Sequence, residues 1–96
     1  MNDHIRGILE NSLDKYVEEE SLKAIYEGLR RILKDMNSKY STLVAYEYAD
    51  LFPFYCDLVK AAERKEITVT DLREFDNWFK ANALRKIEEK ADVYGI

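Results

Sequence analysis

The chain has 96 residues, of which 47% are hydrophobic and 35% are charged, and its formal net charge is −4. This composition is too apolar for an intrinsically disordered chain and too charged for a membrane-embedded one. The mild acidic excess also disfavours a protein whose main task is to grip phosphate backbones. We therefore expect one globular helical-bundle domain that spans residues 1–96.

Cysteine usage and the N-terminal segment give expectations about the compartment. Cys56 is the only cysteine, which excludes an intramolecular disulfide and indicates a reducing environment. We find neither a secretory signal nor an uncharged apolar stretch of about 18 residues, so we expect a cytoplasmic protein. The lack of glutamine, together with abundant Glu, Lys, Ile and Tyr, is a bias seen in proteins of hot environments, although a mesophilic helical domain could share it.

The first half of the chain predicts two helices. Apolar residues spaced by three and four predict a helix over residues 3–17, with Asp3 as its N-cap. Three glutamates then interrupt the pattern, and Ser21 is the expected N-cap of a second helix. This second helix carries the most regular apolar stripe of the chain, formed by Leu22, Ile25, Tyr26, Leu29, Ile32, Leu33 and Met36.

The second half predicts two longer helices. The third, over residues 41–65, is apolar around most of its circumference, and Pro53 predicts either a kink or a break there. Thr68 and Asp71 resemble a capping box that opens a fourth helix, which should run to about Val93 and end before Gly95. The count is four helices, or five if the third is broken at Pro53.

These elements predict an all-α fold, a single compact bundle. Short connections favour antiparallel neighbours, so a mainly antiparallel up-down arrangement is the first expectation. An orthogonal array stays open, because periodicity reports which face is buried and not the angle at which helices cross.

Most of the chemistry that a catalyst needs is missing from the sequence. His4 is the only histidine, so a histidine-based metal cluster cannot form within one chain. Cys56 lies among apolar residues, where a thiol is usually an inert, buried hydrophobe. Three glycines are too few for a phosphate-binding loop. We expect no enzyme, no metal and no cofactor.

Several large apolar residues fall outside the expected core faces of the third and fourth helices. On a helical projection some lie among acidic residues, and others lie at or beyond the edge of the buried arc. Such residues are either core or a surface kept for a partner. The leading hypothesis is a non-enzymatic protein-interaction or scaffolding module, whose partner is another protein chain or a second copy in a homodimer, bound through Leu43, Tyr46, Phe54, Trp78 and Leu84.

The alternative hypothesis is a nucleic-acid-associated accessory protein. Its binding surface would be the basic face of the second helix, formed by Lys23, Arg30, Arg31 and Lys34. The acidic residue Glu27, interleaved on that helix, and the lack of a helix-turn-helix pattern weigh against it. A membrane-surface role ranks third, since no strongly basic amphipathic segment is present.

Overall fold

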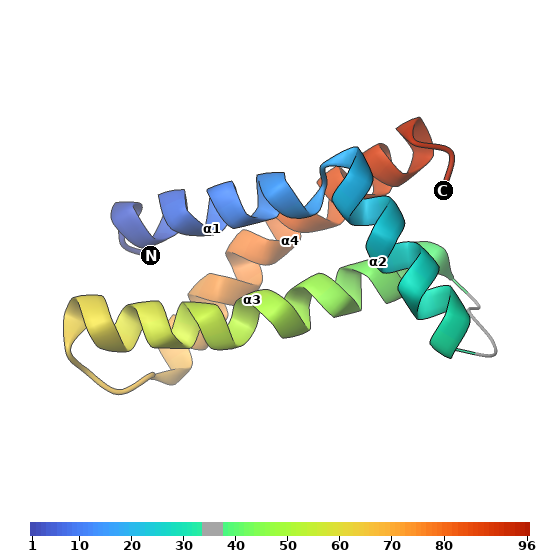
Figure 1. Ribbon diagram of the computed structural model, residues 1–96. Helices are drawn as coiled ribbons and strands as arrows, with labels where there is room; N and C mark the ends of the chain where they lie inside the picture. The colour runs from blue at the N-terminus through green and yellow to red at the C-terminus, as the bar shows by residue number, and fades with distance from the viewer. Residues whose placement is uncertain (34–37) are drawn as a thin grey trace.

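The computed structural model describes residues 1–33 and 38–96, and these residues form four helices (Figure 1). The helices are α1 (Asp3–Tyr16), α2 (Glu19–Ile32), α3 (Lys39–Glu63) and α4 (Val69–Val93). No strand occurs within the described ranges. The prediction of an all-α fold with four helices is confirmed. None of the described helices is both long enough and apolar enough to cross a membrane.

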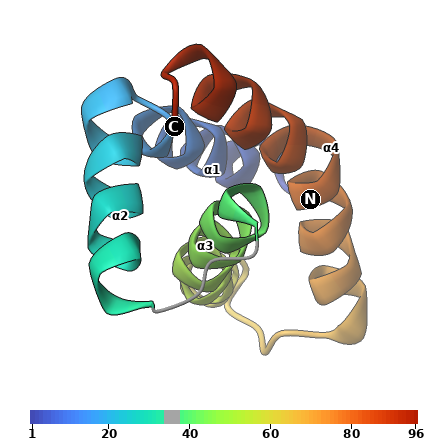
Figure 2. The same cartoon turned by 90° about the vertical axis from the view of Figure 1, so that its right-hand side faces the viewer.

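The helices do not form the expected up-down bundle. Helices α1, α3 and α4 pack along the length of the molecule, whereas α2 crosses them at one end (Figures 1 and 2). α1 and α4 run in the same direction, as two contacts show. Near the starts of the two helices the amino group of Met1 pairs with Glu74 at 2.9 Å, and near their ends the Tyr94 hydroxyl donates to the Val17 carbonyl at 2.6 Å. A transverse α2 explains this: the chain enters α3 antiparallel to α1, and α4 then returns parallel to α1. The antiparallel prediction is therefore not confirmed for the bundle as a whole.

The starts of α1 and α2 differ from the predicted caps. Asn2 and not Asp3 is the N-cap of α1, since its side chain accepts a hydrogen bond from the His4 N–H at 2.7 Å. α2 begins two residues before Ser21, with Glu18 in the N-cap position and no capping side chain. The helix can begin there because acidic residues fill its first turn, where the helix dipole favours them.

α3 is one continuous helix through Pro53, so the five-helix alternative is not found. It begins after Ser38, whose hydroxyl accepts a hydrogen bond from the Ser41 N–H at 3.2 Å. Proline leaves the carbonyl four residues earlier, that of Ala49, without its helical donor. Both Ala49 and Pro53 lie on the exposed side of α3, where water can bind that carbonyl.

The predicted capping box opens α4. The Thr68 hydroxyl accepts from the Asp71 N–H at 3.2 Å, and the Asp71 carboxylate accepts from the Thr68 N–H at 2.9 Å. Lys65 adds an ion pair to the same carboxylate at 2.7 Å. Because Asp71 is buried, this end of α4 is tied firmly to the preceding loop.

Replacing Asp71 with alanine is expected to destabilise the protein by about 1–3 kcal/mol, since the change removes a cap and an ion pair together. Lys65 and the Thr68 N–H lower the pKa of Asp71 from its ordinary 3.8. The contribution of the Asp71 carboxylate to the free energy of unfolding is therefore full above pH 3.8 and is lost as the pH falls through the lowered pKa. Urea unfolding at pH 7 and pH 3 should show a smaller difference between variant and wild type at pH 3. Asp57→Ala, at an exposed position of α3, serves as the control.

The core lies along one line of α3 and is filled by aromatic rings from α3 and α4. The buried residues of α3 recur every four positions and are Leu43, Glu47, Leu51, Tyr55 and Val59. Phe75 of α4 lies within 5.0 to 6.1 Å of five other aromatic rings, measured between ring centroids. The sequence pattern had placed Leu43 and Glu47 together on a polar face, and that prediction was wrong.

Candidate functional site

The five residues predicted to bind a partner separate into two groups. Leu43 and Trp78 are core residues, with 0% and 7% of their surface exposed. Tyr46, Phe54 and Leu84 are 42%, 39% and 36% exposed. Only the second group can contribute to a surface that a partner reaches.

Tyr46 and Leu84, two of the exposed residues, do not share one surface on α3 and α4. Leu84 borders a groove with Tyr48 and Phe79 between α3 and α4, whereas Tyr46 borders a different groove beside α2. Tyr46 and Tyr48 are two residues apart, which places them roughly 160° apart around the helix. The predicted interface through both helices is therefore divided between two faces.

The apolar face of α2 is only partly covered by the other described helices. Within Glu19–Ile32, Leu22 is the one residue of the apolar stripe that is buried. Ile25, Tyr26 and Leu29 are half-buried, while Ile32 and Leu33 are 78% and 41% exposed. Because α2 crosses the end of the other helices, it meets them over only part of its length (Figure 2).

A groove of about 330 Å³ lies between this face and α3. We call it the α2 groove, and it is lined by Ala24, Ile25, Gly28, Leu29, Ile32 and Tyr46. Two small residues, Ala24 and Gly28, form its depression. The guanidinium of Arg31 lies at its edge, since a Cβ placed on Gly28 would be 3.8 Å from Arg31 Nη2.

The aromatic wall of the α2 groove is held in place by α1. The Tyr46 ring stacks on the Tyr16 ring with centroids 6.1 Å apart and planes inclined by 12°. The Tyr16 hydroxyl donates to the Leu43 carbonyl at 2.7 Å and is buried. The partly exposed Tyr46 ring is therefore already held in one orientation. Little conformational entropy is lost when a ligand binds to it.

Glu47 is buried directly beside this wall. It is 1% exposed, and its Oε2 atom has no hydrogen-bond partner within the described structure. Burial, with a smaller contribution from the nearby carboxylate of Asp50, raises the pKa of Glu47 to about 8. At neutral pH the carboxyl group is therefore largely protonated.

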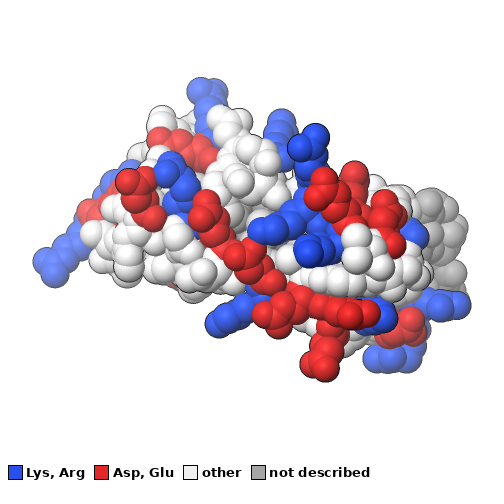
Figure 3. Space-filling model, turned by 90° about the horizontal axis from the view of Figure 1, so that it is seen from above, with Lys and Arg blue, Asp and Glu red and all other residues white. Residues whose placement is uncertain are grey.

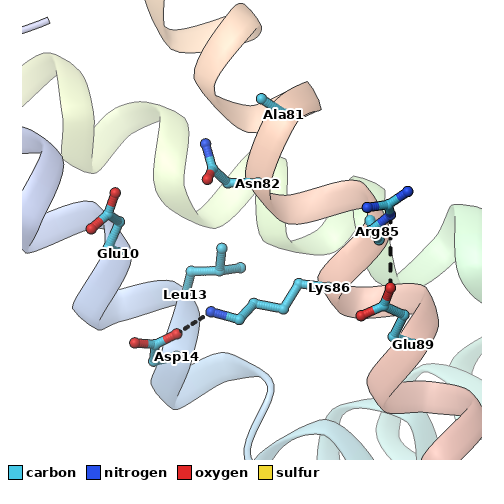
Figure 4. Close-up of a pocket in the computed structure, with 8 residues that line it drawn as sticks. All are labelled: Glu10, Leu13, Asp14, Ala81, Asn82, Arg85, Lys86 and Glu89. Atoms are coloured by element: carbon cyan, nitrogen blue, oxygen red, sulfur yellow. Dashed lines mark hydrogen bonds and ion pairs between the residues drawn. The ribbon is translucent and has the colours of Figure 1, made fainter.

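A third groove, between α1 and α4, is polar (Figure 4). Its ion pairs join Lys86 to Asp14 across the two helices and Arg85 to Glu89 along α4. Figure 3 shows a diagonal band of acidic side chains on the face seen from above, with basic side chains on both sides. Because four of the five charged side chains that line this groove pair with one another, we interpret it as a contact between two helices of the fold.

The basic residues of α2 form a limited surface. Lys23 pairs with Glu19 at 2.8 Å, and Arg30 and Arg31 are exposed on the last turn. Lys34 lies outside the described residues. The structure thus places two exposed arginines and one paired lysine on this helix, interleaved with Glu27.

The residues considered for catalysis are not brought together into a recognisable site. Cys56 is half-buried, and burial raises the pKa of its thiol, which disfavours the reactive thiolate. Over residues 1–33 and 38–96, no three His, Cys, Asp or Glu side chains are grouped so that they could hold a metal ion.

Comparison with known proteins adds no functional assignment, since no family model, curated protein or solved structure matches this chain.

Sequence reasoning had recognised the apolar stripe of α2 but placed the partner surface on the third and fourth helices. The sequence did contain a signal for a groove. Ala24 and Gly28 are two small residues four positions apart on a helix whose other apolar side chains are large. Whether such a pair faces the core or solvent depends on the crossing angle of α2, which the sequence pattern does not give.

Proposed function

We propose that the protein is a non-enzymatic protein-interaction module that binds an amphipathic helix of a protein partner in the α2 groove. The observation that carries the proposal is the uncovered apolar face of α2 beside Tyr46. A helix bound there would cover Ile32 and the exposed side of Tyr46, and so remove apolar surface from water.

The shape and chemistry of the groove suit a helical ligand. Ala24 and Gly28 let a ligand backbone approach α2 closely, and Tyr46 supplies the kind of fixed aromatic surface that interfaces favour. Apolar anchors on such a ligand would recur at spacings of three and four residues. Arg31 places a positive charge beside the groove, and such a rim charge orients a ligand more than it attracts it.

Titration with a synthetic amphipathic helical peptide tests this function. We expect saturable chemical-shift changes in the ¹H–¹⁵N NMR spectrum at α2 and Tyr46. Gly28→Leu should abolish them, because the new side chain fills the groove while leucine favours a helix more than glycine does. Ala61→Leu, at an exposed position near the far end of α3, is the matched control and should bind normally. Absence of saturable shifts at about 1 mM peptide would exclude a groove of useful affinity.

A further inference from the structure

We propose that the helix that occupies the α2 groove is α2 of a second copy of this chain, so that two α2 helices pack antiparallel around a twofold axis at Gly28. This inference rests on the proposed function, because it names the partner of the same groove. It differs from a dimer built on α3 and α4, where Tyr46 and Leu84 border separate grooves.

The first argument is the match between a projection and a depression on the same helix. Ile32 is 78% exposed, and the groove is lined by the small residues Ala24 and Gly28. Ile32 and Ala24 each lie four residues from Gly28, on opposite sides of it in sequence. A twofold axis at Gly28 therefore places Ile32 of each copy over Ala24 of the other. Each copy supplies both the side chain that projects and the space that receives it.

The second argument is the chemistry of the two flanks. At 100° per residue, Ile25 and Ile32 lie on one side of Gly28, and Glu27 and Arg31 lie on the other. A twofold axis perpendicular to the plane of two antiparallel helices brings like flanks together. The apolar flank then meets the apolar flank of the other copy, and Glu27 of each copy lies within about one turn of Arg31 of the other.

This charge complementarity selects a second copy over an unrelated helix. An unrelated helix could fill the depression at Ala24 and Gly28. It would also need a depression that receives Ile32, and charges of opposite sign placed against Glu27 and Arg31. A second copy of α2 already contains that depression and those charges. Since a 14-residue helix is only about 21 Å long, the buried area falls below that of a standard interface, and we expect a dissociation constant on the order of 100 μM.

Sedimentation equilibrium of the full chain tests the dimer. The wild type should dimerise, and Ile32→Asp should be monomeric and still helical by circular dichroism, since Ile32 is largely exposed. Glu27→Arg and Arg31→Glu should each weaken the dimer about tenfold or more, because like charges then face each other across the axis. The double variant should restore it. Arg85→Glu, in the comparable exposed pair with Glu89 on α4, is the control and should leave the dimer unchanged.

Disulfide trapping tests the position of the axis. In a Cys56→Ser background, Gly28→Cys should form a covalent dimer under mild oxidation, because the two introduced cysteines face each other near the axis. Arg85→Cys in the same background should not. A Gly28→Cys variant that crosslinks no faster than Arg85→Cys overturns the antiparallel arrangement.

The outcomes separate the dimer from the proposed function. A wild type that stays monomeric at about 1 mM, while a helical peptide still binds and Gly28→Leu blocks it, overturns the dimer and leaves the function standing. A chain that neither dimerises nor binds a helical peptide overturns both. Dimerisation that survives Ile32→Asp and both charge reversals shows a different interface, and also overturns this inference.

Discussion

Replacing Glu47 with glutamine is expected to stabilise the protein by roughly 3–5 kcal/mol above pH 8 and to have little effect near pH 4.5. Glu47 is 1% exposed in the line of core residues along α3, and its Oε2 atom has no partner in the described structure. A charge at that position is costly because the surroundings cannot solvate it. Glutamine keeps the size of the side chain and removes the possibility of ionisation.

The sign of the pH dependence follows from the raised pKa. Burial moves the pKa of Glu47 from 4.5 in an ordinary environment to about 8 in the folded protein. Between these two values the folded state binds more protons than the unfolded state, so the free energy of unfolding decreases as the pH rises. Below about 4.5 both states are protonated and no penalty exists. Asp71, whose pKa is lowered, contributes in the opposite direction and at more acidic pH.

Urea unfolding of the wild type and Glu47→Gln from pH 4 to pH 9 measures this contribution as a difference between the two proteins. Glu10→Gln, at an exposed position of α1, is the control and should show no comparable trend. The prediction fails if the difference between Glu47→Gln and wild type is constant across that range. NMR titration of the Glu47 carboxyl carbon gives an independent check on its pKa.

Local sequence signals predicted much of the secondary structure. The capping box at Thr68 and Asp71 and the end of α4 at Val93 are correct because they depend on hydrogen bonds between residues a few positions apart. The N-caps of α1 and α2 were misplaced by one to three residues, since several polar residues near each start can serve as a cap.

Local sequence signals could not predict the direction in which the helices run or which face of α3 is buried. α3 is apolar around most of its circumference, so its core line was set by how α1 and α4 pack against it. Glu47 lies on that line, although a charged residue ordinarily indicates solvent. The crossing of α2, which leaves the α2 groove open, is likewise a tertiary property.

Leu43 and Leu84 provide a matched pair that tests the assignment of the predicted partner residues. The helical projection placed Leu43 among acidic residues and Leu84 outside the core arc of its helix, yet Leu43 is 0% exposed and Leu84 is 36% exposed. Leu43→Ala should therefore lower the free energy of unfolding by about 2–5 kcal/mol, because it leaves a cavity next to the Tyr16 hydrogen bond. Leu84→Ala should cost about 1 kcal/mol or less, since its side chain is already partly in water.

Chemical unfolding monitored by circular dichroism measures both effects. The comparison is matched, because each substitution removes three carbon atoms from the wild-type protein. Near-ultraviolet dichroism should change in Leu43→Ala, because the carbonyl that accepts from the Tyr16 hydroxyl belongs to Leu43 and the Tyr16 ring stacks on Tyr46. Leu84→Ala should leave this signal unchanged. Equal destabilisation by the two substitutions would contradict the assignment of Leu43 to the core and of Leu84 to the surface.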